Sequence, residues 1–492
     1  MFNSLSARLT LLAAAAALSS CAVGPNFKPP AIRAPGGYLA PGRSSGYESR
    51  VAPAASESAA GPYAQHLVRG ANPSAEWWRS FHSPELDALI GSALAHNETL
   101  AAARARVAQA RALARAEAGR LYPQIGFDGG AGRQKLGKEV LGPVDLPPFG
   151  YVAAGAEVSY TFDYLGGIAR SVQERRALAQ YSRREAEAAY LCLTGSVVAQ
   201  AIRAAAARSE LRAVAAILSE DRRNLALVRS AYRNGSVSRV DLVSAKSQLA
   251  ADETLLPPLR QQLAVARHAL AVLVGRLPAQ WRAPALSLSR LTLPRRLPLS
   301  LPSSLVRRRP DILAAQAQLH AATAAVGVAT ANLYPRITLG ASGGWQSFAG
   351  EALFERSNAA WSLITGLTAP LFDGGTLRAE RRASLDQLRA SAAQYQEMVL
   401  QAFGQVADIL DALRHDAEML AAQSNALQAA RSSVALARES YSAGNTGVLR
   451  VLEAQRQRLR AHLGVLRAEA QQYSDTTQLF LALGGGPLKE RP

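Results

Sequence analysis

The chain has 492 residues, 49% of them hydrophobic, and a formal net charge of +18 at pH 7. This length is sufficient for two or more units that each bury a core, so a duplicated body is possible. The positive charge comes from arginines scattered through alanine-rich segments, and the dense basic clusters, such as residues 307–309, are short. That distribution is typical of solvated helix faces and argues against a nucleic-acid-binding protein, whose charge would gather in one stripe or arm.

The N-terminus has the pattern of a signal peptide. Residues 1–20 combine Arg8 with an apolar run too short to span a bilayer. The run ends in LSSC, which resembles the lipobox of bacterial lipoproteins, so Cys21 is the predicted lipid attachment site, and Ala22 favours the outer membrane. The alternative is an ordinary secretory signal with a chance cysteine. An acylated Cys21 would leave Cys192 without a disulfide partner, and no later apolar run predicts a membrane-spanning helix.

An extended segment and a helix follow the signal. Residues 21–75 are rich in Pro, Gly, Ser and Ala and are predicted to wrap or tether as extended chain. One helix is predicted from its N-cap Ser83 to Tyr122, because Pro123 disfavours the α conformation in the residue before it. Apolar residues recur in this helix every seven positions from Leu100 to Leu121, which predicts a packed seam.

The second half of the chain repeats the order of the first. The stretch LYPQIGFDGGAG at 121–132 has an echo, LYPRITLGASGG, at 333–344. A second helix, opened by Pro310 and Asp311, precedes the echo and again ends at a Tyr-Pro pair. The echo predicts an internal duplication.

After each Tyr-Pro pair, apolar residues alternate with small or polar ones. Even positions from Val152 to Phe162 are apolar, while odd positions from Gly155 to Asp163 are small or polar. A period of two predicts a strand with one apolar and one polar face. Three further strands show the pattern, at Ile125 and Phe127, at Ile337, Leu339 and Trp345, and at Trp361, Leu363, Leu367 and Leu371. Each copy thus holds two strands of transmembrane length, about 9 to 13 residues, joined by loops near 136–150 and 349–358.

Two long helices are predicted from Tyr164 to about Arg233 and from Gly374 to about Ala443. Their seam positions alternate steps of three and four, and are Leu211, Val214, Leu218, Asp221, Leu225, Val228 and Tyr232 in the first copy, and Leu420, Gln423, Leu427, Ala430, Val434, Ala437 and Tyr441 in the second. Uncapped patterns of this length indicate coiled coils on the order of 100 Å long. Gly235 and Gly444 are predicted left-handed C-caps, and a further helix follows each of them, broken at Pro257-Pro258 in the first copy.

Four transmembrane strands cannot close a pore, and open sheet edges are not tolerated in lipid. Several chains must therefore share one barrel, and three chains would supply 12 strands, within the bacterial range.

The motifs resemble those of the outer-membrane efflux lipoproteins in the OprM and NodT branch of the TolC family. The matching stretches are CAVGPNFKPP after the lipobox, WWRSFHSPELDALIGSALAHN, RRRPDILAAQAQL, NLYPRITL, APLFDGG and YSAGNTGVLRVLEAQ, and they run from Cys21 to Gly486. The resemblance implies a mainly α fold with membrane β: long antiparallel helices form a periplasmic α-barrel, and four strands per chain join a 12-stranded trimeric β-barrel.

The domain organisation expected from the duplication has five parts. They are the signal peptide (1–20), the lipidated extended segment (21–75), a first repeat of helix, β-hairpin, long helix and helix (76–290), a second repeat in the same order (291–486) and a short tail (487–492).

Several motifs that could carry chemistry are better explained structurally. Residues 340–344 match the G-x-S-x-G pattern of a hydrolase elbow around Ser342, but that elbow needs a helix after the serine, whereas a strand is predicted here. The seven histidines are dispersed, so neither a zinc site nor a cofactor is indicated. The arginines at 307–309 precede a helix start, which favours a structural or salt-bridging role. We therefore expect no enzymatic activity.

Asp408 and Asp411 are the candidate periplasmic gate. A spacing of three places both carboxylates on one helix face. The stretch resembles the acidic constriction of the TolC family, and a trimer would bring six carboxylates around one axis, where they would attract cations. The alternative is two solvated acids on an outer helix face.

The sequence therefore predicts a passive outer-membrane exit duct in a tripartite efflux system for drugs or other toxic small molecules. The resemblance implies a homotrimer anchored by lipid in the outer membrane, with a large periplasmic part. It also implies a periplasmic adaptor, expected to bind turns near 190–210 and 400–420, and an inner-membrane pump of the resistance-nodulation-division type. The alternatives are an export duct of the type I secretion kind and a non-conducting structural lipoprotein. The exported compounds, the pump and the ion preference of the lumen stay open.

Overall fold

The computed structural model describes residues 22–31, 36–39, 65–135 and 147–486. Cys21 lies outside these ranges. The strands are β1 (His66–Arg69), β2 (Gln124–Gln134), β3 (Phe149–Phe162), β4 (Arg296–Leu299), β5 (Arg336–Ser347) and β6 (Ala359–Thr368). The α-helices are α3 (Pro84–His96), α4 (Glu98–Gly119), α5 (Gly167–Arg233), α6 (Arg239–Glu253), α7 (Leu256–Leu273), α8 (Pro302–Val306), α9 (Pro310–Ala331), α10 (Thr376–Ser442) and α11 (Val448–Ala482).

The contacts divide the chain into two compact units. The first, here the sheet unit, comprises Met1–Ala31, Arg106–Arg183 and Ala314–Gln396. The second, the helical unit, comprises Ile32–Ala105, Arg184–Leu313 and Glu397–Pro492. The long helices α5 and α10 contribute residues to both.

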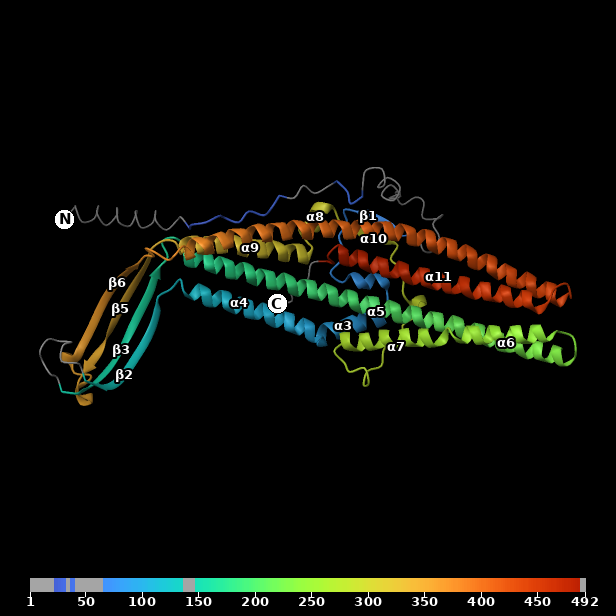
Figure 1. Cartoon of the computed structure of the whole chain (residues 1–492), viewed down its shortest axis with the longest axis horizontal. Helices are drawn as coiled ribbons and strands as arrows, with labels where there is room; N and C mark the ends of the chain where they lie inside the picture. Colours follow the sequence, from blue (N-terminus) through green and yellow to red (C-terminus); the bar gives the residue numbers. More distant parts are fainter. Residues whose placement is uncertain (1–21, 32–35, 40–64, 136–146, 487–492) are drawn as a thin grey trace. The chain divides into compact units, whose positions relative to one another are not determined.

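In the sheet unit, β2, β3, β5 and β6 lie side by side in one antiparallel sheet (Figure 1). Their lengths of 11, 14, 12 and 10 residues confirm the strands predicted from the period-two pattern. One boundary was wrong, because β6 ends at Thr368 and Leu371 lies beyond it.

The two long helices are confirmed. Helices α5 and α10 have 67 residues each, which corresponds to about 100 Å of helix. Both are followed by a glycine in the left-handed region, Gly235 with φ of 74° and Gly444 with φ of 76°. The expected turns near 190–210 and 400–420 are absent from these described segments, which are continuous helix.

The helix predicted from Ser83 to Tyr122 is two helices. Ser83 caps α3 as expected, since its Oγ accepts a hydrogen bond from the Leu86 amide at 3.3 Å. The chain then turns at Asn97, whose Oδ1 accepts from the Leu100 amide and so caps α4. Its Nδ2 also donates to the Leu273 carbonyl, and Gly275 packs against the His96 carbonyl. The break therefore depends on a contact with a distant segment, which local helix signals do not reveal.

In the part of the chain that the structure describes, two helices are long and apolar enough to cross a membrane by length and composition alone, whereas the sequence predicted none. They are α5 and α9, and 50% and 61% of their most apolar windows are buried within the protein. Burial at this level is typical of helices that pack in a protein core. The expectation of membrane insertion continues to rest on the strands.

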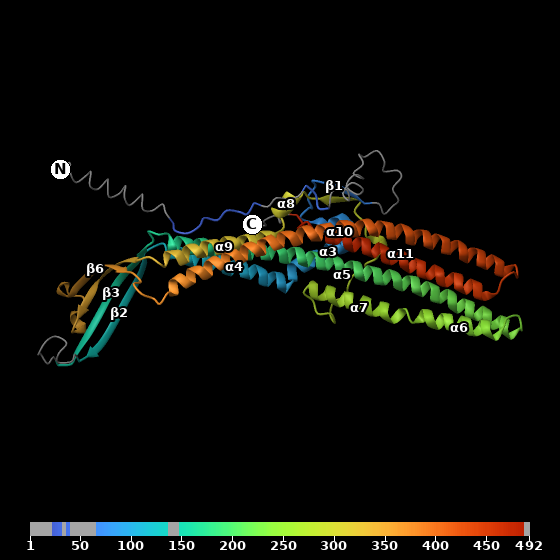
Figure 2. The same ribbon diagram turned by 45° about the horizontal axis from the view of Figure 1, so that its top comes forward.

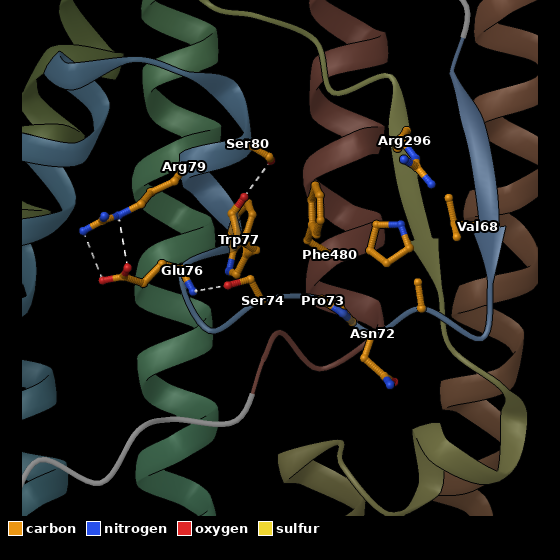
Figure 3. Close-up of a pocket in the computed structure, with 12 residues that line it drawn as sticks. Val68, Asn72, Pro73, Ser74, Glu76, Trp77, Arg79, Ser80, Arg296 and Phe480 are labelled. Atoms are coloured by element: carbon orange, nitrogen blue, oxygen red, sulfur yellow. Dashed lines mark hydrogen bonds and ion pairs between the residues drawn. The ribbon is translucent and has the colours of Figure 1, made fainter. Parts of the chain in front are cut away.

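A small parallel sheet and an aromatic cluster lie in the helical unit. Strands β1 and β4 pair with the register His66 to Arg296, a pairing the sequence did not predict. Beside these strands, of which β1 is labelled in Figure 2, the short 3₁₀ helix Trp77–Phe81 buries its aromatic rings. Trp77 stacks on Phe480 of α11 with ring centroids 5.3 Å apart (Figure 3).

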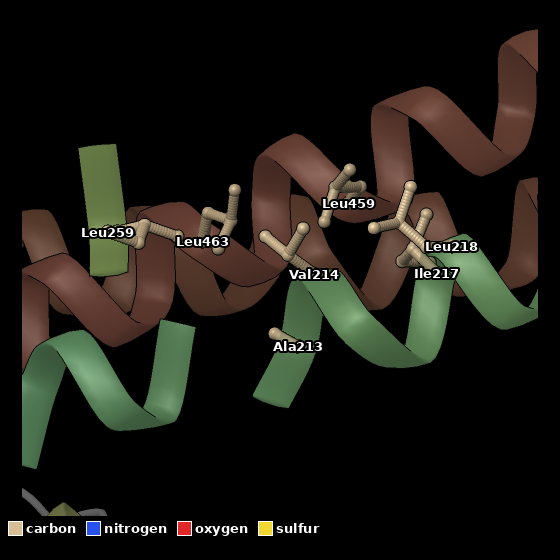
Figure 4. Close-up of a cluster of buried hydrophobic side chains, with 7 residues drawn as sticks. All are labelled: Ala213, Val214, Ile217, Leu218, Leu259, Leu459 and Leu463. Carbon is tan, nitrogen blue, oxygen red and sulfur yellow. The ribbon is translucent and has the colours of Figure 1, made fainter. Parts of the chain in front are cut away.

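Farther along the helical unit the seam positions make a shared core. Val214 and Leu218 of α5 pack with Leu459 and Leu463 of α11 and with Leu259 of α7 (Figure 4). Val214 and Leu218 are 0% and 2% exposed, which confirms these seam positions of the first long helix. The last predicted position of each seam was wrong, because Tyr232 and Tyr441 are 39% and 41% exposed.

Candidate functional site

The four-stranded sheet is open at both edges within the described chain. Its strand order is β2-β3-β5-β6, so β2 and β6 each have a hydrogen-bonded neighbour on one side only. An unpaired edge presents free backbone donors and acceptors, which bind another strand readily and are costly to leave in lipid. The sheet is therefore incomplete as a membrane structure in a single chain.

One face of the sheet is apolar and exposed. The register places one residue of each strand in a row across the sheet. One row on this face is Phe127, Ala156, Gly343 and Trp361, and the next is Ile125, Val158, Ala341 and Leu363. Phe127, Trp361 and Leu363 are 77%, 78% and 73% exposed. Large apolar side chains at this exposure are typical of a surface that faces lipid or a partner.

The opposite face is polar. Gly126, Glu157, Ser342 and Ser362 form one of its rows. The Ser342 and Ser362 hydroxyls are 2.8 Å apart, and Ser342 lies in the middle of β5. The strand–turn–helix geometry of a hydrolase elbow is therefore not present around this serine, although the sequence pattern matches it.

Aromatic side chains gather at both ends of the strands. At the loop end, Phe149 contacts Phe348 and Trp345 contacts Phe354, with ring centroids 5.2 and 5.6 Å apart. At the helix end, Phe162 stacks on Tyr164, whose hydroxyl donates to the Pro335 carbonyl at 2.7 Å. Girdles of aromatic rings at the two interfaces are characteristic of outer-membrane barrels.

Equivalent aspartates join strand to long helix in both copies. The Asp163 carboxylate accepts from the Ile168 and Ala169 amides at 3.0 and 2.8 Å, and so caps α5. The Asp373 carboxylate accepts from the Gly375 and Leu377 amides, both at 2.9 Å, at the start of α10. These backbone hydrogen bonds hold the pKa of Asp373 below its usual value.

The candidate gate acids lie in the middle of α10, far along the helix from the turn at Gly444. Asp408 is exposed, while Asp411 is half-buried and accepts a hydrogen bond from Arg414 at 3.2 Å. In one chain, Asp408 is thus exposed to solvent, whereas Asp411 forms an ion pair with Arg414 on its own helix.

Two carboxyl pairs lie between neighbouring helices, one buried and one with a half-buried member, Asp416. Asp221 of α5 faces Asp252 of α6, and the two are 4% and 7% exposed. Asp416 of α10 faces Asp475 of α11, which is 6% exposed. Burial, together with the facing carboxyl, raises the pKa of Asp221 and of Asp416 to about 7.

The sequence contained a partial signal for the first pair. Asp221 occupies a seam position of the predicted coiled coil, where an acid must be buried or paired. Its partner was not predictable, because the spacing along one helix does not fix the register of the next.

The turns that end the long helices carry exposed apolar side chains. Around Gly235 these are Leu227, Val240 and Val243, which are 69%, 66% and 55% exposed. Around Gly444 they are Leu436, Tyr441 and Leu449, which are 66%, 41% and 42% exposed. Apolar groups left uncovered in one chain are available to neighbouring chains.

A shallow pocket in the helical unit lies beside the stacked Trp77 and Phe480 rings (Figure 3). Its other lining residues include Val68, Asn72 and Arg296. No group of three or more His, Cys, Asp or Glu side chains that could hold a metal occurs in the part of the chain that the structure describes. Cys192, although its sequence context is apolar, is exposed.

Arg309 has the structural role expected for the basic cluster. It is 8% exposed, its Nε donates to both oxygens of Asp311, and its Nη1 donates to the Ala482 carbonyl at 3.1 Å. The arginine thus joins the start of α9 to the end of α11.

Open sheet edges, an exposed apolar face with aromatic ends and two 67-residue helices define an outer-membrane channel protein. The sequence matches the family described as Outer membrane efflux protein over residues 89–276 and 301–485. The chain belongs to this family, and it is an outer-membrane channel component of an efflux system.

Similar proteins cover nearly the whole chain. The pyoverdine export outer membrane protein OpmQ of Pseudomonas putida is 32% identical over 425 residues, which are 85% of this chain and 90% of that protein. The solvent efflux pump outer membrane protein SrpC of Pseudomonas putida is 29% identical over 415 residues, 82% of this chain and 86% of that protein. The solved structure of the outer-membrane channel OprN matches with a TM-score of 0.80 and 26% identity, over 95% of this chain and 99% of that one.

Proposed function

We propose that three copies of this chain close a 12-stranded barrel in the outer membrane and surround a passive exit duct. The observation that carries the proposal is the four-stranded sheet, which has two unpaired edges and an exposed apolar face. Pairing β2 of one chain with β6 of the next satisfies both edges, and three chains bring the strand number into the range of bacterial barrels.

The duct has no chemistry of its own. Energy comes from an inner-membrane pump of the resistance-nodulation-division type through a periplasmic adaptor, and the exported molecules are toxic small compounds. The names of the relatives, which refer to pyoverdine and to solvents, support small organic cargo. The chain is held in the outer membrane by acylated Cys21, as its lipobox indicates.

The two-repeat division at 76–290 and 291–486 belongs to this proposal. It is supported by the matching order of helix, two strands, long helix and helix in each half, and by the paired caps Asp163 and Asp373.

Ion conductance of the purified oligomer in planar bilayers tests the duct. We expect discrete single-channel openings and a native mass of three chains. A non-conducting oligomer of any size would favour the structural lipoprotein instead. Accumulation of solvents or dyes in cells lacking the protein, without loss of protein secretion, would separate small-molecule efflux from export of the type I secretion kind.

The gate is tested on the same helix. We propose that Asp408 and Asp411 narrow the periplasmic part of the duct, so Asp408→Ala with Asp411→Ala should raise single-channel conductance or weaken block by divalent cations. The matched control is Asp386→Ala, since Asp386 pairs with Arg389 at 2.7 Å on α10 in the same i,i+3 geometry as Asp411 with Arg414. Unchanged currents in the double variant would favour the alternative, in which both acids are solvated on an outer face of the helix.

A further inference from the structure

Arg170, in the first turn of α5, is buried and is surrounded by the first residues of the described chain. It is 5% exposed. Its Nε donates to the Val23 carbonyl at 3.1 Å, and its Nη2 donates to Asn26 Oδ1 at 2.7 Å. The carbonyls of Ala22 and Gly24 lie 3.5 and 3.4 Å from the same Nη2.

None of these acceptors is a carboxylate. The remaining hydrogen bond of the guanidinium, from Nη1 to Gln173 Oε1 at 2.8 Å, also goes to a neutral oxygen. A buried charge without a counter-charge is costly unless its donors are all satisfied. The five donors of a guanidinium fit a cage of carbonyl oxygens, whereas a lysine ammonium has three donors and no planar fork.

Glycines shape a groove for the same segment. A Cβ at Gly166 would lie 2.6 Å from the Ala22 Cβ, and a Cβ at Gly327 would lie 3.0 Å from the Val23 carbonyl oxygen. The Val23 amide donates to the Leu165 carbonyl at 3.0 Å. Farther along, Phe27 stacks on His320 with ring centroids 4.4 Å apart. Contacts from α5, α9 and the turn after β3 thus hold residues 22–27, here called the strap.

We propose that Arg170 is a positioning residue for the membrane anchor: it fixes the strap against the start of α5 and so holds the acylated N-terminus at the membrane boundary. The inference rests on the proposed acylation of Cys21. The geometry follows from chain connectivity, because Ala22 packs against Gly166, and Gly166 comes shortly after Phe162, the last residue of membrane strand β3. Ala22 is the residue next to Cys21 in the chain.

A fixed strap differs in effect from a loose tether. Acyl chains on a free tether would hold the protein near the membrane without orienting it. Acyl chains attached near the end of β3 enter the leaflet next to the helix-side ends of the strands, where the Phe162 and Tyr164 rings lie. The anchor then favours the depth at which the apolar face of the sheet meets lipid.

The test measures the position of the strap in the full-length protein purified from membranes. Nitroxide labels are placed at Lys28→Cys and Arg175→Cys, both exposed positions of the sheet unit, in a Cys192→Ser background. We expect a narrow distance distribution between the labels. Arg170→Gln should broaden it, and the Val23 amide should exchange with solvent about tenfold faster, because hydrogen bonds to a charged group are lost.

Matched variants separate positioning from charge and from general stability. Arg176→Gln removes an exposed arginine of the same helix and should leave the distribution narrow. Arg170→Lys keeps the charge but should not restore the narrow distribution, since only the planar fork reaches the carbonyl cage. If Arg170→Gln loses its helical signal, the test uses Asn26→Ala instead. This variant removes the 2.7 Å contact without changing α5, and it should also broaden the distance distribution.

A narrow distance distribution in Arg170→Gln or in Arg170→Lys would overturn the inference. A broad distance distribution in the labelled protein that keeps Arg170 would overturn it as well. Failure of the proposed acylation is recognised separately, by the intact mass of the purified chain. The distance distribution should also stay narrow in Cys21→Ser, because the contacts of the strap do not involve the lipid.

Discussion

The carboxyl pairs of the helical unit make its stability depend on pH. Asp221 faces Asp252 and also lies beside Glu220, while Gln248 donates to Asp252 at 2.6 Å and in turn accepts from Arg456 of α11 at 2.7 Å. Burial first, and then the facing carboxyl, raise the pKa of Asp221 to about 7. The folded chain therefore keeps a proton that the unfolded chain loses near pH 4.

The sign of the pH effect follows from this proton. The stabilising contribution is complete below about pH 4, declines as the pH rises and is lost above about pH 7. We expect Asp221→Asn, which cannot ionise, to raise the melting temperature relative to the unaltered protein by a few degrees at pH 8 and little at pH 5. Asp386→Asn, at an exposed acid of α10 outside the proposed gate, is the control. A melting difference that is the same at both pH values would contradict the retention of this proton by Asp221.

Asp416→Asn should behave in the same way, since Asp416 faces Asp475 between α10 and α11. The two pairs have no residue in common, so the effects of the two substitutions should add. The sequence identified Asp221 as a seam residue. It did not identify Asp252 as its partner, nor the second pair, Asp416 and Asp475. A heptad pattern fixes the buried face of one helix and leaves open which residue of the next helix meets it.

The strands show where local pattern determines an element and where it does not. A period of two was sufficient to place all four membrane strands and to divide their faces, because each side chain has only two directions to take. The short strands β1 and β4 and the break at Asn97 were missed, since each depends on a partner distant in the sequence. The fold of the membrane part is therefore more predictable than that of the segment around Trp77.

Adjacent glycines in β5 test the close approach of the central strands. A Cβ at Gly344 would overlap the Ala154 carbonyl oxygen, whereas a Cβ at Gly343 would meet nothing within 4 Å. Gly344→Ala should therefore lower the temperature at which the assembled oligomer dissociates, by a strain on the order of 1–3 kcal/mol per chain. Gly343→Ala introduces the same methyl group on the other face and should leave that temperature nearly unchanged. Equal effects of the two variants would show that the strands separate freely.

The whole assembly follows from surfaces that one chain leaves uncovered. A single chain leaves three surfaces uncovered: the strand edges, the apolar sheet face and the exposed side chains near Gly235 and Gly444. Exposing them destabilises a lone molecule, and further copies and lipid cover them. The sequence predicted the first two from composition and period. It could not predict the lumen, because the overall charge of +18 does not say which charges face inward.

The polar face of the sheet supplies an answer for the membrane part. It carries Asp128 and Glu157 within its strands and Arg336 at one end, by the register that also places Ser342 and Ser362 together. If this face lines the lumen, each chain contributes a net negative charge there although the protein as a whole is basic. The membrane part should then prefer cations.

Glu157→Lys should shift the reversal potential in a salt gradient toward anion preference, since charges inside a narrow pore select ions directly. Glu157→Gln should give a smaller shift in the same direction. Asp386→Asn, an exposed acid on α10, serves as the control for a charge change outside the membrane part. A reversal potential unaffected by Glu157→Lys, in channels that still conduct, would mean that the polar face of the sheet does not line the conducting path.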